Sequence, residues 1–152
     1  IDAARAFFVA RFGFAETFAS EWYVSLRHPA PPHPELAFLR PSHETVPAGD
    51  GAPARGVIVN VEVADATAAW AALRAAAPVR VALRDEPLGQ RHFVLAGPGG
   101  VLVDVIENIA PAPEFAAQFT APVAAPVAAP VTAPVTAQHT AGGVPAGPED
   151  AG

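Results

Sequence analysis

The feature that most constrains the fold of this chain is an internal repeat. The segments "DAARAFFVARF" and "DATAAWAALR" align with Asp2 on Asp65, 63 positions apart, and this register also places Phe7 on Trp70 and Arg11 on Arg74. Three strand-like runs follow each segment. Self-similarity at a fixed spacing indicates that one supersecondary unit is used twice.

The second copy of the repeat has a strand-like run, "GVIVNVEVA", in front of its helix, whereas the first copy has only Ile1 there. We therefore expect a first strand of roughly eight residues to precede Ile1 and to be absent from this chain, a length ordinary for strands. The repeated unit is then β-α-β-β-β, and the expected fold class is α+β.

In the first copy, the pattern predicts a helix over residues 2–12 with Asp2 as its N-cap. Ala4, Phe8 and Phe12 form one apolar stripe, and Gly13 ends the helix. Strands are expected over residues 15–18, 22–27 and 35–39.

In the second copy, the strand over residues 57–63 places four valines on one face and Ile58, Asn60 and Glu62 on the other. Asp65 is the expected N-cap of the following helix, and Pro78 lies just past its end. Strands are expected over residues 79–85, 91–96 and 101–107, and the last two flank the turn signal "GPGG".

The domain organisation follows from these patterns. Residues 1–109 form one domain, with modules at 1–40 and 56–109 and a polar linker at 41–55. Residues 110–152 form an Ala/Pro-rich tail that includes four copies of Ala-Pro-Val-Ala/Thr over 121–136. Proline at every fourth position forbids a helix or a central strand, so we expect an extended or disordered tail.

Composition excludes several classes of function. The chain has no Cys, which rules out disulfides and thiolate chemistry, and all nine of its Lys and Arg residues are Arg. A Schiff-base or phosphate-loop lysine is therefore absent. The net charge of −6 disfavours nucleic acid and anionic membranes as partners. No apolar run approaches the ~20 residues that span a bilayer. No signal peptide is visible, although the chain does not start with Met, and we expect a cytoplasmic protein.

The order and spacing of several segments resemble a known family. Paired β-α-β-β-β modules, "FGF" after the first helix, "VEVAD" before the second and "EPLGQRHFVLAGPGGVLVDVIE" at the end are similar to the glyoxalase / bleomycin-resistance / extradiol-dioxygenase (vicinal oxygen chelate) superfamily. The resemblance covers residues 1–109 and none of the tail. It implies two curved sheets that form a U-shaped cleft for a ligand or a metal.

Enzymes of that superfamily bind a divalent metal through His, Glu and Asp side chains on the first and last strands of each module. Carried over to the second module, these positions are Ile58, which cannot coordinate, and Asp104, an oxygen donor. In the first module only Glu35 is available. Such sites use three or four protein ligands, so no metal site and no cofactor are expected. Asp104 stays a weak candidate ligand for Zn, Ni, Mn or Fe.

The resemblance turns the Asn60 and Glu62 face toward the cleft, together with Asp104. A mostly apolar pocket with a few convergent polar groups is a common kind of small-molecule site. A solvated sheet face with ordinary polar residues gives the same pattern, and the sequence leaves both readings open.

The facing of the "QRHF" segment depends on the hairpin register. With a plain four-residue loop at 97–100, Phe93 pairs with Asp104, so Arg91 and Phe93 share the cleft face. A one-residue bulge turns His92 toward Asp104 instead. A His–Asp pair is a candidate acid/base couple. We therefore keep Arg91, His92 and Phe93 as candidate ligand-binding residues beside Asn60, Glu62 and Asp104.

Two functional classes follow from the resemblance. The preferred one is a metal-independent protein of the bleomycin-resistance type that binds a small cationic or aromatic molecule in the cleft. The alternative is a metal-dependent glyoxalase- or dioxygenase-like enzyme, whose remaining ligands come from the absent first strand or from a partner chain. The family often pairs, so a homodimer is expected.

Overall fold

The fold is described from a computed structural model, which describes residues 1–120. Module 1 consists of α1 (Asp2–Phe12), β1 (Ala15–Ala19), β2 (Tyr23–Arg27) and β3 (Glu35–Leu39). Module 2 consists of β4 (Ile58–Glu62), α2 (Ala66–Leu73), β5 (Val79–Glu86), β6 (Gln90–Ala96) and β7 (Leu102–Asn108). The short helices η1 (Pro98–Gly100) and α3 (Pro113–Ala116) complete the described part of the chain.

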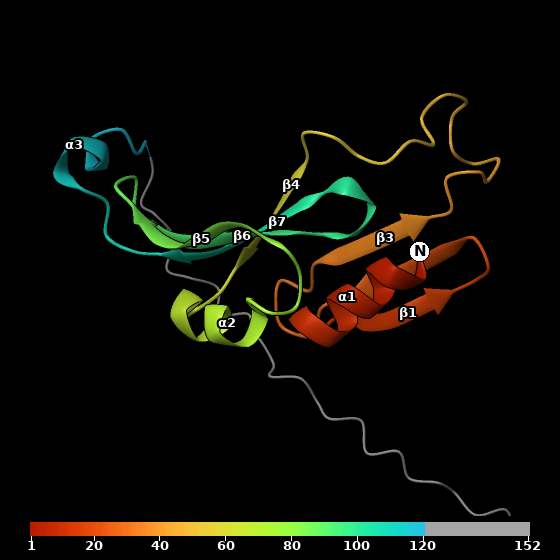
Figure 1. Ribbon diagram of the computed structural model, residues 1–152, viewed down its shortest axis with the longest axis horizontal. Helices are drawn as coiled ribbons and strands as arrows, with labels where there is room; N and C mark the ends of the chain where they lie inside the picture. Colours follow the sequence, from red (N-terminus) through yellow and green to blue (C-terminus); the bar gives the residue numbers. More distant parts are fainter. Residues whose placement is uncertain (121–152) are drawn as a thin grey trace, which may run out of the picture.

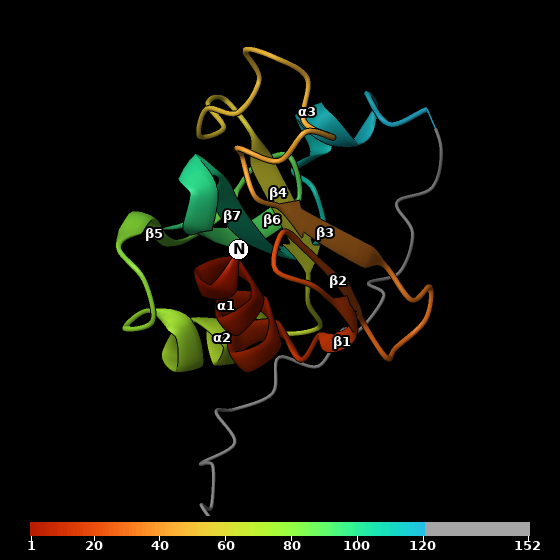
Figure 2. The same ribbon diagram turned by 90° about the vertical axis from the view of Figure 1, so that its right-hand side faces the viewer.

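Each module builds one sheet, and the two sheets differ by one strand. Sheet A is antiparallel with the order β1-β2-β3. Sheet B is mixed, with the order β4-β7-β6-β5, because β4 runs parallel to β7 while the other pairs are antiparallel. The helices α1 and α2 both lie in the lower part of the view in Figure 1, α2 below sheet B and α1 beside the strands of sheet A, and Figure 2 shows the same arrangement turned by 90°. The expected α+β fold with a repeated module is confirmed.

A single apolar core joins the modules. Phe8 and Phe12 of α1 pack with Val24 and Leu26 of β2, and the same cluster continues into module 2. There it contains Val63, Ala66, Ala69, Leu73, Phe93, Leu95, Val103 and Val105. The stripe of Ala4, Phe8 and Phe12 expected on α1 is buried, as predicted.

The two predicted helix N-caps have different outcomes. Asp65 accepts a hydrogen bond from the Ala68 amide at 2.9 Å, which confirms it as the cap of α2. Asp2 is wrong as a cap, because Ile1 occupies the N-cap position of α1 and Asp2 lies in the first turn, 3.1 Å from Arg5. Gly13 ends α1 in the left-handed conformation, with φ 69°, as expected.

The first part of the predicted tail, residues 110–120, contains a short helix, contrary to the expected extended chain. Residues 113–116 form the one-turn helix α3, and the Ala112 amide donates a hydrogen bond to the Pro87 carbonyl at 2.8 Å. The segment at residues 109–112 is thus held against the β5–β6 turn, where the Ile109 amide also donates to the Gly89 carbonyl at 2.9 Å. The Ala-Pro-Val repeats lie outside the described residues. Within residues 1–120, no helix has the length and apolar character needed to cross a membrane.

The hairpin between β6 and β7 resolves the register question. Ala96 pairs with Leu102, Val94 with Asp104 and His92 with Ile106. The connection therefore spans residues 97–101, and the Gly97 amide donates to the Val101 carbonyl across it at 2.9 Å. Gly99 and Gly100 have φ values of 70° and 86°, a conformation that glycine adopts without strain. The plain four-residue loop is excluded.

Candidate functional site

The polar residues of module 2 gather on the face of sheet B that lies opposite α2, which we call the polar face. Its members follow from the strand pairings, because paired residues point to the same side of a sheet. Asn60 pairs with Asp104, Ile58 with Leu102 and Glu62 with Ile106. His92 of β6 is diagonal to Asp104 and pairs with Arg84 of β5. The polar face thus collects side chains from four strands.

His92 is the centre of a hydrogen-bonded cluster on the polar face. Its Nδ1 lies 2.9 Å from Asp104 Oδ1, and its Nε2 lies 3.3 Å from Glu86 Oε1. Only 13% of the His92 side chain and 14% of the Asp104 side chain are exposed. Each ring nitrogen of His92 thus lies within hydrogen-bond distance of a carboxylate oxygen.

Glu86 extends this cluster to an arginine. The Arg84 Nε donates to Glu86 Oε1 at 2.6 Å. This hydrogen bond, followed by the one from His92, holds the pKa of the Glu86 carboxyl below its ordinary value of 4.5. Glu86 is therefore an anion at neutral pH. The cluster of Arg84, Glu86, His92 and Asp104 ties β5, β6 and β7 together.

Asn60 and Glu62 are free polar groups of the polar face. Both residues are exposed, and within residues 1–120 neither side chain has a hydrogen-bond or ion-pair partner. On the adjacent strand β7, the partner of Glu62 is the buried Ile106 and the partner of Asn60 is Asp104. An amide, an acid and apolar surface are thus available to a molecule that settles on this face.

Arg91 and Phe93 lie on the opposite face of sheet B, which corrects the alternative that placed them beside Asp104. The Phe93 side chain is fully buried and packs edge-to-face against Trp70 of α2, with ring centres 5.3 Å apart. Arg91 donates two hydrogen bonds to the Asp85 carboxylate, at 2.7 and 2.9 Å. The five-residue connection of the hairpin is the reason, because one extra residue exchanges the two faces of a strand.

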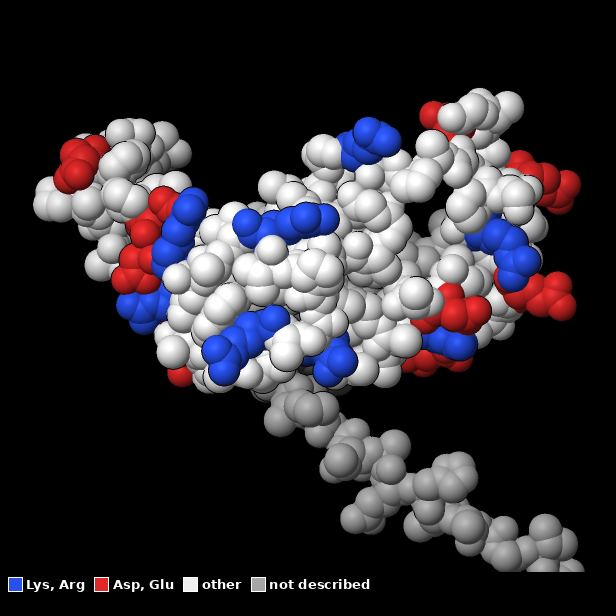
Figure 3. Space-filling view, in the orientation of Figure 1, with Lys and Arg blue, Asp and Glu red and all other residues white. Residues whose placement is uncertain are grey.

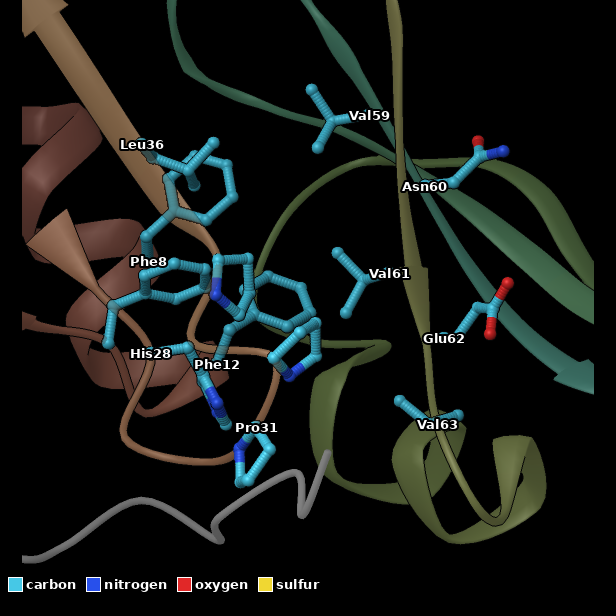
Figure 4. Close-up of a pocket in the computed structure, with 13 residues that line it drawn as sticks. Phe8, Phe12, His28, Pro31, Leu36, Val59, Asn60, Val61, Glu62 and Val63 are labelled. Atoms are coloured by element: carbon cyan, nitrogen blue, oxygen red, sulfur yellow. The ribbon is translucent and has the colours of Figure 1, made fainter. Parts of the chain in front are cut away.

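A second concavity lies between the modules, and we call it the groove. It has a volume of about 360 Å³ and lies between α1, β3 and β4. Its apolar walls come from Phe8, Phe12, Phe14, Leu36, Val59, Val61 and Val63, and its rim comes from His28, Pro31, Pro32 and Pro34. Figure 4 shows Val59, Val61 and Val63 pointing toward Phe8 and Phe12, whereas the side chains of Asn60 and Glu62 point away. The groove and the polar face are therefore separated by β4.

Some of the charged residues outside these two sites form surface pairs. Arg5 contacts Asp2 and Glu16 at 3.1 and 3.2 Å, and Arg27 lies 3.6 Å from Glu35. In the face shown in Figure 3, opposite charges lie next to each other at both ends of the molecule, and the middle is mostly uncharged apart from arginines. Such exposed pairs contribute little to stability, and they mark no obvious site.

Comparison with solved structures gives consistent matches. A glyoxalase/bleomycin resistance protein/dioxygenase from Nocardioides is 21% identical with a TM-score of 0.56, over 71% of this chain and 76% of the other. A glyoxalase/bleomycin resistance protein/dioxygenase superfamily member from Sphaerobacter thermophilus is 22% identical with a TM-score of 0.56, over 70% and 87%. A lactoylglutathione lyase from Agrobacterium tumefaciens is 20% identical with a TM-score of 0.56, over 70% and 84%.

This chain has the glyoxalase/bleomycin-resistance/dioxygenase fold. These matches and the two-sheet topology of this chain agree with the resemblance of the repeated sequence. No model of a known protein family matches the chain, and no curated protein sequence matches it. At these identities the likeness establishes the fold and leaves the activity open.

The residues at the metal-ligand positions of this fold do not suit a divalent metal. Ile58 is apolar and 54% exposed, and Asp104 is hydrogen-bonded to His92. The acid of module 1, Glu35, is paired with Arg27. Among residues 1–120, no group of three or more His, Asp or Glu side chains is placed to hold a metal ion.

Three residues of these sites were missed by sequence reasoning. Arg84 and Glu86 complete the His92 cluster, and only their alternation with Asp85 in the "RDE" run placed them on one face. His28 is 4% exposed and lies at the rim of the groove, where its Nδ1 accepts a hydrogen bond from the Ala30 amide at 3.1 Å. Its position in a Pro-rich loop gave no signal of burial.

Proposed function

We propose that this protein binds a small molecule without a metal, in the manner of the bleomycin-resistance members of its fold. The observation that carries the proposal is the His92 cluster. At the place where the resemblance puts a metal-binding acid, Asp104 Oδ1 is largely buried and already lies within hydrogen-bond distance of His92 Nδ1, at 2.9 Å. A metal ion at the same oxygen would have to displace this contact and leave the ring nitrogen without its partner.

The expected ligand is a molecule with a cationic group and an apolar body. Glu62 supplies an exposed carboxylate with no partner among the described residues, and Asn60 supplies an amide next to Asp104. Ile58, Leu102 and Ile106 supply apolar contact area on the same face. The net charge of −6 adds long-range attraction for a cation. A homodimer is part of this proposal, because the exposed Phe18 and Leu39 on sheet A provide apolar surface for a second copy.

The test uses the purified chain after dialysis against a chelator. Bleomycin is the probe, and binding is measured by titration calorimetry. We expect binding by the metal-free protein, and we expect Glu62→Gln to weaken it about tenfold, as loss of a charge-assisted contact does. Glu21→Gln is the matched control, because Glu21 is an exposed acid in the β1–β2 turn. Absence of binding, or equal binding by both variants, overturns the proposal.

The alternative of a metal-dependent enzyme is tested with the same sample. Elemental analysis of the protein, and titration with Zn, Ni, Mn and Fe, measure whether a metal binds in a one-to-one ratio. If stoichiometric metal restores formation of lactoylglutathione from its hemithioacetal precursor, the protein is a metal-dependent enzyme. The proposal of a metal-independent binding protein is then overturned. We expect neither retained metal nor turnover.

A further inference from the structure

Two carboxamide side chains lie next to each other at one end of the polar face. Asn108 is the last residue of β7 and pairs with Gln90, the first residue of β6. They lie two positions along their strands from Ile106 and His92, which are on the polar face, so their side chains point to the same side of sheet B. Glu86 of β5 pairs with Gln90. The polar face therefore ends in a row of two amides and an acid.

The two amides of this row are open to a ligand. Gln90 and Asn108 are both half-buried, and among residues 1–120 neither side chain makes a hydrogen bond. No buried side-chain nitrogen or oxygen in this part of the chain lacks a partner, so the amide atoms of both residues reach the surface. Each amide has an N–H₂ donor group and a carbonyl acceptor. The pair can therefore both donate to and accept from one bound group.

The chain beyond Asn108 borders this end of the polar face. Backbone hydrogen bonds hold residues 109–112 against the β5–β6 turn. A side chain at Gly89 in that turn would lie 3.0 Å from the Ile109 carbonyl oxygen, so glycine permits this close approach. The helix α3 follows, and both views show it on the opposite side of sheet B from α2, which is the side of the polar face (Figures 1 and 2). The amide pair thus lies where sheet B meets this segment.

An acid lies at a set spacing from the amide pair. Glu62 of β4 pairs with Ile106, which is two residues before Asn108 on the adjacent strand. With a rise of ~3.4 Å per residue and ~4.8 Å between strands, the Cα atoms of Glu62 and Asn108 are about 8 Å apart. Glu62 is the residue to which the proposed function assigns the cationic group of the ligand. A molecule held there by its charge has its neighbouring atoms within reach of the amide pair.

We propose that Gln90 and Asn108 recognise a carboxamide or peptide group of the ligand, and that the site selects cations with an amide a few bonds from the charge. A secondary amide has one N–H donor and one carbonyl acceptor, which a side-chain amide matches with its own carbonyl and N–H₂ groups. An ester of the same shape has no N–H, so one of these hydrogen bonds is lost. The inference rests on the proposed function, because it concerns the same face.

The test compares two probes that differ in this one group. Procainamide consists of an aromatic ring, a carboxamide and a tertiary amine, and procaine is the ester of the same skeleton. Both are cations at neutral pH. Each probe is titrated into the full chain, and NMR follows the side-chain N–H₂ signals of Asn60, Gln90 and Asn108. We expect procainamide to bind about tenfold more tightly than procaine, as loss of one or two neutral hydrogen bonds predicts, and to shift the signals of Gln90 and Asn108.

Two variants assign the preference to the amide pair. Gln90→Met and Asn108→Leu keep the approximate size of each side chain and remove its amide. Each should reduce the preference for procainamide to about twofold or less. Gln118→Met is the matched control, because the exposed Gln118 side chain already donates to the Glu114 carbonyl, at 3.3 Å. This variant should keep the tenfold preference.

The comparison on the native chain does not depend on how the variants fold. Equal affinity of the native chain for both probes, no binding of either probe, or an unchanged preference in both variants overturns the inference. The bleomycin titration with Glu62→Gln decides the proposed function separately. If bleomycin binds while the two probes do not differ, the amide site is wrong and the proposed function stands.

Discussion

His92 Nδ1 lies 2.9 Å from Asp104 Oδ1, and this contact crosses the β6–β7 hairpin on the polar face. The pair is diagonal across the hairpin, with Val94 directly opposite Asp104. Because Glu86 holds the other ring nitrogen, the imidazole is fixed in one orientation. The polar face therefore has a hydrogen-bonded cluster on β5, β6 and β7, while its polar groups on β4 have no partner among the described residues.

The first prediction concerns the strength of this pair. Asp104→Ala should lower the free energy of unfolding by about 1–3 kcal/mol, because it leaves a largely buried imidazole without its acceptor. In a double-mutant cycle with His92→Gln, the coupling energy should be about 1 kcal/mol or more. Urea unfolding measures both values.

The control cycle uses Asp2 and Arg5, whose side chains are 84% and 41% exposed. An exposed pair of this spacing should couple by at most about 0.5 kcal/mol. Equal coupling energies for the two pairs would show that burial gives the His92–Asp104 contact no extra strength.

The second prediction concerns acid stability. The pKa of Glu86 is lowered in the folded state by Arg84 and His92, and that of Asp85 is lowered by Arg91. A carboxyl with a lowered folded pKa contributes stability that is present above its unfolded value and is lost as the pH falls through the folded pKa. The contribution of Glu86 should thus disappear as the pH drops below its ordinary value of 4.5. Urea midpoints measured across this range should fall more steeply for the native chain than for Glu86→Gln, and parallel curves would contradict the assignment.

The third prediction concerns the start of α2, which has two acceptors. Asp65 Oδ1 accepts from the Ala68 amide and Glu107 Oε2 accepts from the Ala66 amide, each at 2.9 Å. Asp65→Ala should cost about 1 kcal/mol of unfolding free energy, as loss of an N-cap does. Glu107→Ala should cost a similar amount. Asp2→Ala is the matched control at the other helix, where no cap is lost, and its cost should be within about 0.5 kcal/mol of zero. Calorimetric or urea unfolding decides between these values.

The fourth prediction concerns the shared core. Phe8 is 1% exposed and touches the rings of Phe12, Phe14 and Phe38, with centres 5.5–5.9 Å apart. Phe8→Ala should lower the unfolding free energy by about 3–5 kcal/mol. Phe18→Ala, at a position 55% exposed, should cost much less. A small effect of Phe8→Ala would mean that the groove beside it collapses to fill the cavity.

Much of the fold was predictable because it rests on local chemistry. The stripe of Phe8 and Phe12, the end of α1 at Gly13 and the cap at Asp65 each depend on residues close in sequence. Asp2 failed as a cap although it aligns with Asp65. The alignment of the two repeats identifies equivalent positions in the modules. It does not show which residue is the first to adopt helical backbone angles, and this residue decides where the cap lies.

The sequence could not show which of Arg91, His92 and Phe93 point to the polar face. Side chains of a strand alternate between its two faces, and the alternation alone does not say which set lies on which face. The assignment comes from the connection at residues 97–101, where Gly99 and Gly100 have positive φ. The contribution of Glu107 to the α2 cap was missed for a related reason. It joins residues 41 positions apart, and only the folded sheet brings them together.

The length of this connection has an evolutionary consequence. Removal of one residue from the loop would exchange His92 for Arg91 and Phe93 on the polar face, in one mutational step and without a change in any side chain of the strand. A basic and aromatic surface would then stand where a histidine–carboxylate cluster now lies. The same exchange would turn the fully buried Phe93 and Leu95 out of the core, so the stability of sheet B constrains the length of this connection.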